Sequence, residues 1–158
     1  MLLDADASKG GKLVFSLEKE LSSNQKRVAV TQAVTLDRTR PDIGLKGRHG
    51  LFGSQEWWDN IAAGVVPLMR VSGKILKAYR VGRDDDRNNT VELVLSDGSV
   101  KAVGIYVNSR NDISLFIEGS WLDMIYALEE LKVQPAKDGG VNYSKVALEA
   151  VITPSKPE

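Results

Sequence analysis

A run of closely spaced alternating segments between residues 68 and 107 constrains the fold most strongly. Apolar residues recur at every second position over 68–81, 90–95 and 100–107, which indicates strands with one buried face. Residues 84–89 and 96–99 separate these strands, and the Asp97-Gly98 pair in the second segment is typical of a hairpin turn. Consecutive strands joined by short turns pair antiparallel, so this run predicts a meander.

The other segments are expected to add strands and helices to this meander. Residues 27–36, 113–117 and 143–153 alternate like strands, and residues 55–63 and 121–132 are predicted to be helices. The helix over 121–132 is inferred from an apolar stripe at helical spacing, which is formed by Trp121, Ile125, Leu128 and Leu131. Segment 12–21 fits both periods, and its charged helix formers favour a helix over 14–21.

Together these elements predict an α+β fold. We expect a strongly bent antiparallel sheet or a small open β-barrel of five to six strands, with one long packed helix and one or two short helices. Gly73 and Gly104 lie inside predicted strands, where glycine suits a bend or a bulge. A single domain over residues 12–153 is expected, between a flexible N-terminus (1–11) and a flexible tail (154–158).

Charge and cysteine content exclude several classes of function. The 158 residues include 21 Lys or Arg and 21 Asp or Glu, so bulk charge does not favour non-specific binding to nucleic acid or to a membrane. The absence of cysteine excludes disulfides, thiolate metal sites and cysteine nucleophiles. The N-terminus lacks the pattern of a signal peptide and no long apolar run occurs, so a soluble, cytoplasmic protein is expected.

Large aromatic residues are concentrated in the segment Gly50–Ile61. This segment holds two of the three tryptophans and follows the only histidine, His49. Ser54 is a suitable N-cap for a short helix, in which Trp57 and Ile61 share one face and Trp58 lies on the adjacent one. Such a segment either plugs a core or anchors a recognition surface. The sequence leaves both alternatives open.

A long basic loop over residues 37–53 precedes the tryptophans. Basic side chains interleaved with aromatic rings can bind the phosphates of a nucleic acid while its bases stack on the rings. Arg and Trp are also among the residues that contribute most to binding energy at protein interfaces. The candidate binding residues of the loop and the following helix are Arg38, Arg40, Arg48, His49, Phe52, Trp57 and Trp58.

Support for an enzyme is weaker. His49, Ser54 and Asp59 lie close in sequence but lack the flanking pattern of a nucleophile elbow. The run Asp84–Asp86 offers oxygen ligands for a hard cation, although consecutive aspartates point apart on a turn and fit a solvated turn equally. Neither phosphate-binding glycine motif occurs. We therefore expect no catalytic residues, no metal site and no cofactor.

One stretch of the chain carries a resemblance. The run Gly50–Ile61, followed by Gly64, Pro67 and the segment Val71–Ile75, resembles pieces of small uncharacterised bacterial proteins, some of the toxin-immunity kind. The resemblance covers less than a fifth of the chain and identifies no single family. It implies a binding role.

The sequence thus favours a non-enzymatic protein-binding module, an accessory or antidote (immunity) type of small bacterial protein. Its contact surface would comprise the loop 37–53 and the Trp-rich segment 54–61, with Arg48, Trp57 and Trp58 as anchors. A protein partner or self-association, such as a homodimer, is expected. One alternative is a nucleic-acid-binding small β-barrel that uses the basic loop 38–48 and the neighbouring aromatic residues. A third is a divalent-metal-dependent hydrolase that uses Asp84–Asp86, alone or with His49.

Overall fold

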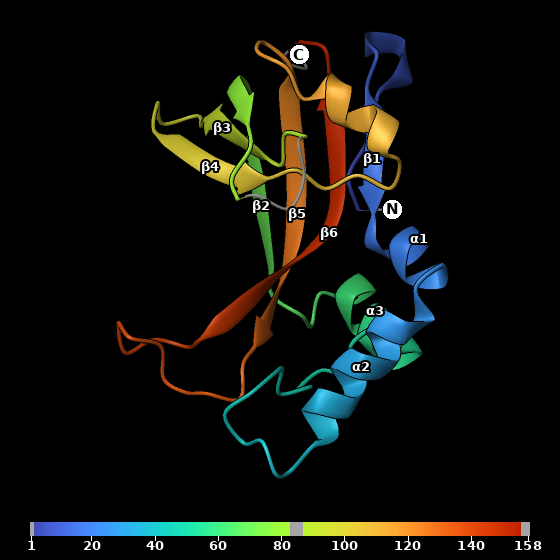
Figure 1. The fold of residues 1–158 in the computed structure, drawn as a ribbon, viewed down its shortest axis with the longest axis vertical. Helices are drawn as coiled ribbons and strands as arrows, with labels where there is room; N and C mark the ends of the chain where they lie inside the picture. The colour runs from blue at the N-terminus through green and yellow to red at the C-terminus, as the bar shows by residue number, and fades with distance from the viewer. Residues whose placement is uncertain (1, 83–86, 156–158) are drawn as a thin grey trace. The chain divides into compact units, whose positions relative to one another are not determined.

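The computed structural model describes residues 2–82 and 87–155, and its main feature is one sheet of six strands (Figure 1). The strand order is β1-β6-β5-β2-β3-β4, so β1 and β4 form the two edges and the sheet does not close. The strands are β1 (Lys12–Ser16), β2 (Leu68–Tyr79), β3 (Thr90–Val94), β4 (Val100–Gly104), β5 (Trp121–Glu130) and β6 (Tyr143–Thr153). An α+β protein with an open antiparallel sheet confirms the predicted fold class.

Three α-helices and two short 3-10 helices complete the described part of the chain. The α-helices are α1 (Leu17–Ser22), α2 (Gln25–Leu36) and α3 (Gln55–Ala62). The 3-10 helices are η1 (Ala7–Lys9) and η2 (Arg110–Leu115). Helix α3 confirms the prediction for 55–63, and Ser54 is its N-cap because its side chain accepts a hydrogen bond from the backbone N–H of Trp57.

The meander β2-β3-β4 forms as the alternation predicts. Strands β2 and β3 pair antiparallel, as do β3 and β4, and the pairing of β2 with β3 shifts register between Ile75 and Lys77. Gly73 lies just before this irregularity, where an added Cβ would lie 2.5 Å from the carbonyl oxygen of Val94. Only glycine permits so close an approach of the two strands.

The segment predicted as the long helix is instead the central strand β5. Residues 122, 124–127 and 129 are all buried, so side chains on both faces of β5 are covered. The strand lies between β6 and β2. A strand inside a sheet can be apolar on both faces. In this segment the apolar residues of the two faces also fall at helical spacing. The prediction over 121–132 was wrong because both periods fitted the same residues.

Helix α2 replaces the strand predicted over 27–36. Its β-branched residues suggested a strand, but the Asn24 side chain accepts a hydrogen bond from the N–H of Arg27 and caps a helix. Gln32 donates a hydrogen bond from its side-chain amide to the carbonyl of Phe52, at 2.9 Å. Contacts outside the segment therefore override its modest strand preference.

Two shorter predictions also differ from the structure. Segment 12–21 divides into strand β1 and helix α1. Its first part follows the strand period and its second part the helical one, so the predicted single helix over 14–21 does not form. Residues 113–117 do not form a strand, because 110–115 are the 3-10 helix η2. The final strand over 143–153 is confirmed as β6. Residues 84–86 of the predicted turn 84–89 lie outside the described residues.

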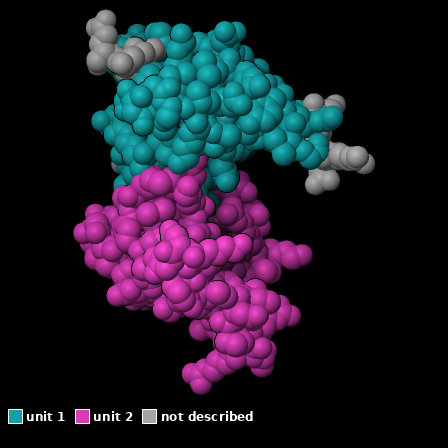
Figure 2. All heavy atoms as spheres, turned by 90° about the vertical axis from the view of Figure 1, so that its left-hand side faces the viewer, with its two compact units in different colours: residues 1–17, 70–125, 147–158 teal, residues 18–69, 126–146 magenta. Residues whose placement is uncertain are grey.

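The chain forms two compact units, coloured separately in Figure 2. Unit 1 comprises residues 1–17, 70–125 and 147–158, and unit 2 comprises residues 18–69 and 126–146. Strands β2, β5 and β6 each contribute residues to both units. The expectation of one domain over 12–153 stays a prediction.

The two units have different interiors. In unit 1 the core is built from sheet residues, among which Ile75, Val91, Leu93 and Leu122 have no or almost no exposed surface. The N-terminal segment joins this core because Leu3 is buried and the carboxylate of Glu149 accepts hydrogen bonds from the N–H groups of Leu2 and Leu3. In unit 2 the core gathers around α3. None of the described helices is long and apolar enough to cross a membrane.

Candidate partner-binding surface

The Trp57 side chain lies at the centre of unit 2. Helix α3 directs it inward, where none of its surface is exposed. Phe52 is also buried, with its ring 5.1 Å from that of Trp57. The indole N–H of Trp57 donates a hydrogen bond to the carboxylate of Glu129 on β5. Of the predicted binding residues, these two thus form the frame that positions the surface and are not displayed on it.

Glu129 is a carboxylate held in an apolar interior. Burial raises its pKa above the ordinary value of 4.5, and this effect outweighs the hydrogen bond from Trp57, which acts in the opposite direction. The charges of His49 and Glu130 also act on it, His49 lowering the pKa and Glu130 raising it. The protonated form of Glu129 is consequently more favoured in the folded protein than in the unfolded chain.

The predicted loop 37–53 is confirmed as irregular, but it is held firmly at the end of β5. Leu45 forms a bridge with Leu131, the N–H of Lys46 donates to the carbonyl of Glu130 at 2.8 Å, and the N–H of Lys132 donates to the carbonyl of Gly44 at 3.0 Å. The middle of the loop is therefore a short extension of the sheet. This contact lies within unit 2.

Lys132 ties the start of the loop to the end of α2. Its ammonium group donates to the carbonyls of Val34 at 2.6 Å, Asp37 at 3.2 Å and Arg40 at 3.1 Å. The last carbonyls of a helix lack partners within the helix and carry partial negative charge, so a cation there stabilises the helix end. One lysine thus fixes the point at which α2 turns into the loop.

Most basic side chains of the loop have acidic partners nearby. Arg48 forms an ion pair with Glu130 at 2.7 Å, and Lys46 lies 3.8 Å from the same carboxylate. Arg40 lies 3.6 Å from the carboxylate of Asp37. These pairs hold the side chains at the surface but leave guanidinium donors directed to solvent, because one carboxylate cannot occupy all five N–H groups of an arginine.

Arg38 and His49 differ in their settings. Arg38 is exposed immediately after the end of α2. His49 is half-buried, and its backbone carbonyl accepts a hydrogen bond from the side-chain amide of Asn60 at 2.9 Å. Neighbouring Asp37 accepts hydrogen bonds from the side chain and backbone of Thr39, which lowers the pKa of its carboxyl. Asp37 therefore stays ionised and partly offsets the charge of the arginines.

Trp58 is half-buried and lines a shallow hollow of about 260 Å³. Its ring meets that of Trp57 edge to face, with centroids 4.8 Å apart. Apolar and polar residues both line the hollow: Glu18, Leu21, Ser22, Gln25, Val28, Gly53, Gln55 and Trp58. Trp58 is thus the one predicted aromatic anchor that remains accessible to a partner.

Helix α2 displays a surface that the sequence analysis missed. No residue of α2 is buried. Val30 is 53% exposed and Leu36 is 64% exposed. With Ala29 and Ala33, both also exposed, they form one stripe at the spacing of helical neighbours. We call these four residues the α2 stripe. A strand prediction divides these residues between two faces, so the stripe emerges only when the segment is recognised as a helix.

The part of the chain that the structure describes contains no candidate metal site. Within residues 2–82 and 87–155 no three His, Cys, Asp or Glu side chains gather in a way that could hold an ion. The run Asp84–Asp86, on which the hydrolase alternative depended, lies outside the described residues.

Comparison with protein families gives a match over most of the chain. The family model described as "Immunity protein RhsI2" matches residues 11–153, which include all described strands and α-helices. A comparison with curated proteins finds no match.

The buried position of Trp57 predicts a large effect on stability. Replacing Trp57 with Ala should lower the free energy of unfolding by about 3–5 kcal/mol, whereas Trp58→Ala should cost roughly 1–2 kcal/mol because that ring is half-exposed. Trp57→Phe keeps an aromatic ring but removes the hydrogen-bond donor to Glu129. Its loss of unfolding free energy should lie between the losses of the other two variants. Urea denaturation followed by circular dichroism measures all three. Equal losses for Trp57→Ala and Trp58→Ala would contradict the interior role of Trp57.

The raised pKa of Glu129 predicts a pH-dependent effect of Glu129→Gln. In the native protein, Glu129 contributes to the free energy of unfolding through its raised pKa. This contribution is fully present below the unfolded pKa of about 4.5 and is lost as the pH rises through the raised folded pKa. Glutamine is uncharged and can still accept the hydrogen bond from Trp57. The stability of the variant relative to the native protein should therefore increase from pH 4.5 towards neutrality. Urea denaturation at several pH values tests this, and a constant difference would contradict it.

Proposed function

We propose that this chain, which belongs to the RhsI2 family of immunity proteins, neutralises a toxin by binding it through the outer surface of unit 2. The family is shown because its model matches most of the chain. An antidote or immunity protein acts by binding a protein partner, so the protein-binding module predicted from the sequence is confirmed at that level. The surface and the mode of binding are the proposal.

The observation that carries the proposed surface is the α2 stripe. A helix in a compact unit normally turns its apolar residues inward, and here Val30 and Leu36 face solvent on a helix with no buried residue. An exposed apolar patch with a polar margin marks an interaction site more often than a single exposed aliphatic residue does. Binding would remove the stripe from water and supply the apolar centre of the interface.

The charges around the α2 stripe indicate the kind of toxin surface that it fits. The whole chain has equal numbers of basic and acidic residues, but residues 25–48 contain six Lys or Arg residues against two Asp residues, and Glu130 lies beside two of the six, Lys46 and Arg48. Arg38 and Arg40 are exposed just beyond the stripe. We therefore propose an acidic toxin surface with an apolar centre, steered to the stripe by charge and held there by burial.

The hollow beside Trp58 extends this surface at the other end of α2. Gln25 and Val28 line the hollow, and Ala29 of the stripe follows Val28 directly and lies one helical turn after Gln25. A toxin side chain inserted against Trp58 would be an anchor of the kind that contributes most to interface affinity. In this proposal Trp58 keeps the anchor role expected from the sequence, Arg38 and Arg40 remain binding residues, and the centre of the contact surface moves from the loop to α2.

The proposed role needs no catalysis by the chain. In the proposed role the chain would neutralise the toxin by covering part of the toxin's surface, and for this it requires only a stable, complementary face. The interior contacts Trp57–Glu129 and Lys132–α2 supply the rigid frame that such a face requires.

Charge introduced into the α2 stripe should abolish tight binding without unfolding the protein. Val30→Asp and Leu36→Asp should each weaken the complex with the cognate toxin domain by about 2 kcal/mol or more, roughly thirtyfold. Both side chains are exposed, so the free energy of unfolding should change little. Isothermal titration calorimetry measures affinity, and growth of cells that produce the toxin measures protection.

Val100→Asp is the matched control for these substitutions. Val100 is 55% exposed and lies on the edge strand β4 in unit 1, so it has the exposure of Val30 but lies outside the proposed surface. It should leave toxin affinity within about twofold. Equal weakening by Val100→Asp, or full protection by Val30→Asp and Leu36→Asp, would show that α2 is not the contact.

Reversing the charge of the two exposed arginines should mainly change the rate of association with the toxin. The double variant Arg38→Glu, Arg40→Glu should slow association with the toxin by about tenfold or more at low salt, and the difference should shrink as salt is added. Lys137→Glu, Lys145→Glu is the charge-matched control, because both lysines are exposed in unit 2 outside the α2 surface. Stopped-flow measurements in which the two double variants behave alike would contradict charge steering by this loop.

A further inference from the structure

Unit 1 contains a second feature, separate from the proposed toxin surface. A hollow of about 510 Å³ is lined by Arg87, Asn88, Arg110, Asn111, Ile113 and Ser114. Among the described residues that line it, five of six side chains are polar, two carry a positive charge and none is acidic. The size lies within the range of pockets for small ligands.

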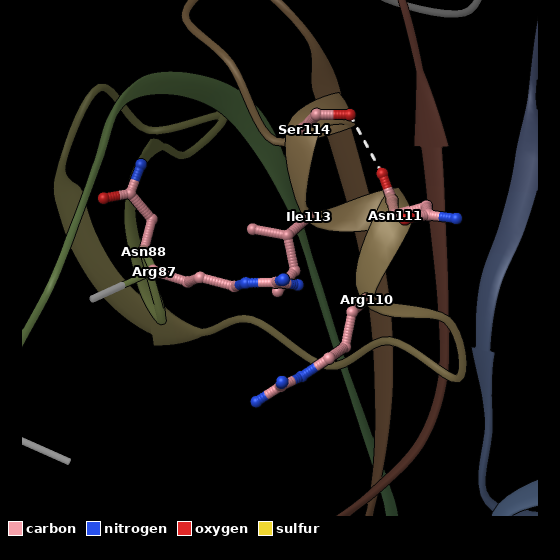
Figure 3. Close-up of a pocket in the computed structure, with 6 residues that line it drawn as sticks. All are labelled: Arg87, Asn88, Arg110, Asn111, Ile113 and Ser114. Atoms are coloured by element: carbon pink, nitrogen blue, oxygen red, sulfur yellow. Dashed lines mark hydrogen bonds between the residues drawn. The ribbon is translucent and has the colours of Figure 1, made fainter. Parts of the chain in front are cut away.

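The hollow has two walls that come from distant parts of the sequence. Residues 87 and 88 precede β3, and residues 110–114 belong to η2. In Figure 3 the side chain of Arg87 reaches across towards Ile113, and Arg110 extends from η2 into the same space. Two arginines from distant parts of the sequence thus line one hollow.

Asn89 fixes the wall that carries Arg87. Its backbone N–H donates to the carbonyl of Tyr79 and its carbonyl accepts from the N–H of Ile105, so it bridges the strands on either side. Its side-chain amide group also exchanges two hydrogen bonds with the backbone of Val81, at 2.9 and 2.7 Å. The chain is therefore anchored directly after residues 87 and 88.

The wall formed by η2 is anchored in a similar way. Phe116, directly after η2, is buried, and the backbone N–H of Asn108 donates to the carbonyl of Val14 on β1. The Ser114 hydroxyl donates to the carbonyl of Asn111 at 2.9 Å. Asp112, the one acidic residue of η2, forms an ion pair with Lys12 at 2.7 Å and does not line the hollow. The charge of Asp112 is thus paired with Lys12 and not with the two arginines.

We propose that this hollow binds the phosphate group of a small phosphorylated ligand. Two guanidinium groups match the double negative charge of a phosphate and donate in the fork geometry that suits its oxygens. Both arginines also interact with other groups of the protein; a guanidinium carries five donors in all, more than a single carboxylate or carbonyl can occupy. The amides of Asn88 and Asn111 add neutral donors, and Ile113 offers an apolar surface to the rest of the ligand.

Binding of inorganic pyrophosphate to the full chain tests this proposal. Calorimetry at low salt should detect saturable binding at millimolar concentration or below. Arg87→Gln and Arg110→Gln should each weaken it by about tenfold or more, because each removes charged hydrogen bonds. Lys74→Gln removes the same charge from an exposed position on β2 outside the hollow and should leave binding within about twofold. Circular dichroism checks that the variants are folded.

Three results would overturn the proposal. One is no pyrophosphate binding by the native chain, and another is equal weakening by Lys74→Gln. The third is binding of succinate as tight as that of pyrophosphate, which would assign the hollow to carboxylates. The result is independent of toxin neutralisation, since Val30→Asp and Leu36→Asp should leave pyrophosphate binding unchanged.

Discussion

The buried contact between Trp57 and Glu129 is the interaction on which the architecture of unit 2 depends. It joins α3 to β5 and places an aromatic ring against Phe52 from the preceding loop. An indole N–H inside a protein needs an acceptor, and a buried carboxylate needs a donor, so each group makes the burial of the other tolerable. With α3 fixed in this way, Gly50 can pass close to the backbone of Trp57, where any side chain would collide.

The same frame explains how a helix with an apolar outer surface persists in solution. No residue of helix α2 is fully buried, but Val28, Val34 and Thr35 are half-buried and lie against Gly53, Gly44 and Gly47 of the loop. The helix is also held by polar contacts, from Asn24 at its start, Gln32 in its middle and Lys132 at its end. Val30 and Leu36 take no part in these contacts and stay exposed, which leaves them available for a partner. Membership of an immunity-protein family fits a surface built for that purpose.

Sequence reasoning predicted the meander, the helix α3, the loop and the final strand because each has one dominant local signal. Segments without one were assigned wrongly. Strand β5 is apolar on both faces, and its spacing fitted a helix equally well. Helix α2 contains many β-branched residues, and the partners that stabilise it, Phe52 and Lys132, are remote in sequence. The α2 stripe depended on this assignment and was missed for the same reason. The position of Trp57 was left open because a tryptophan pair serves equally well in a core or at an interface.

Hydrogen–deuterium exchange of the chain, alone and in complex with its toxin, tests the central claim most directly. The proposed surface predicts that backbone amides of α2 and of residues 37–43 exchange more slowly in the complex, while those of the edge strand β4 are unchanged. Protection confined to other segments, with α2 exchanging as it does in the free protein, would contradict the proposed surface.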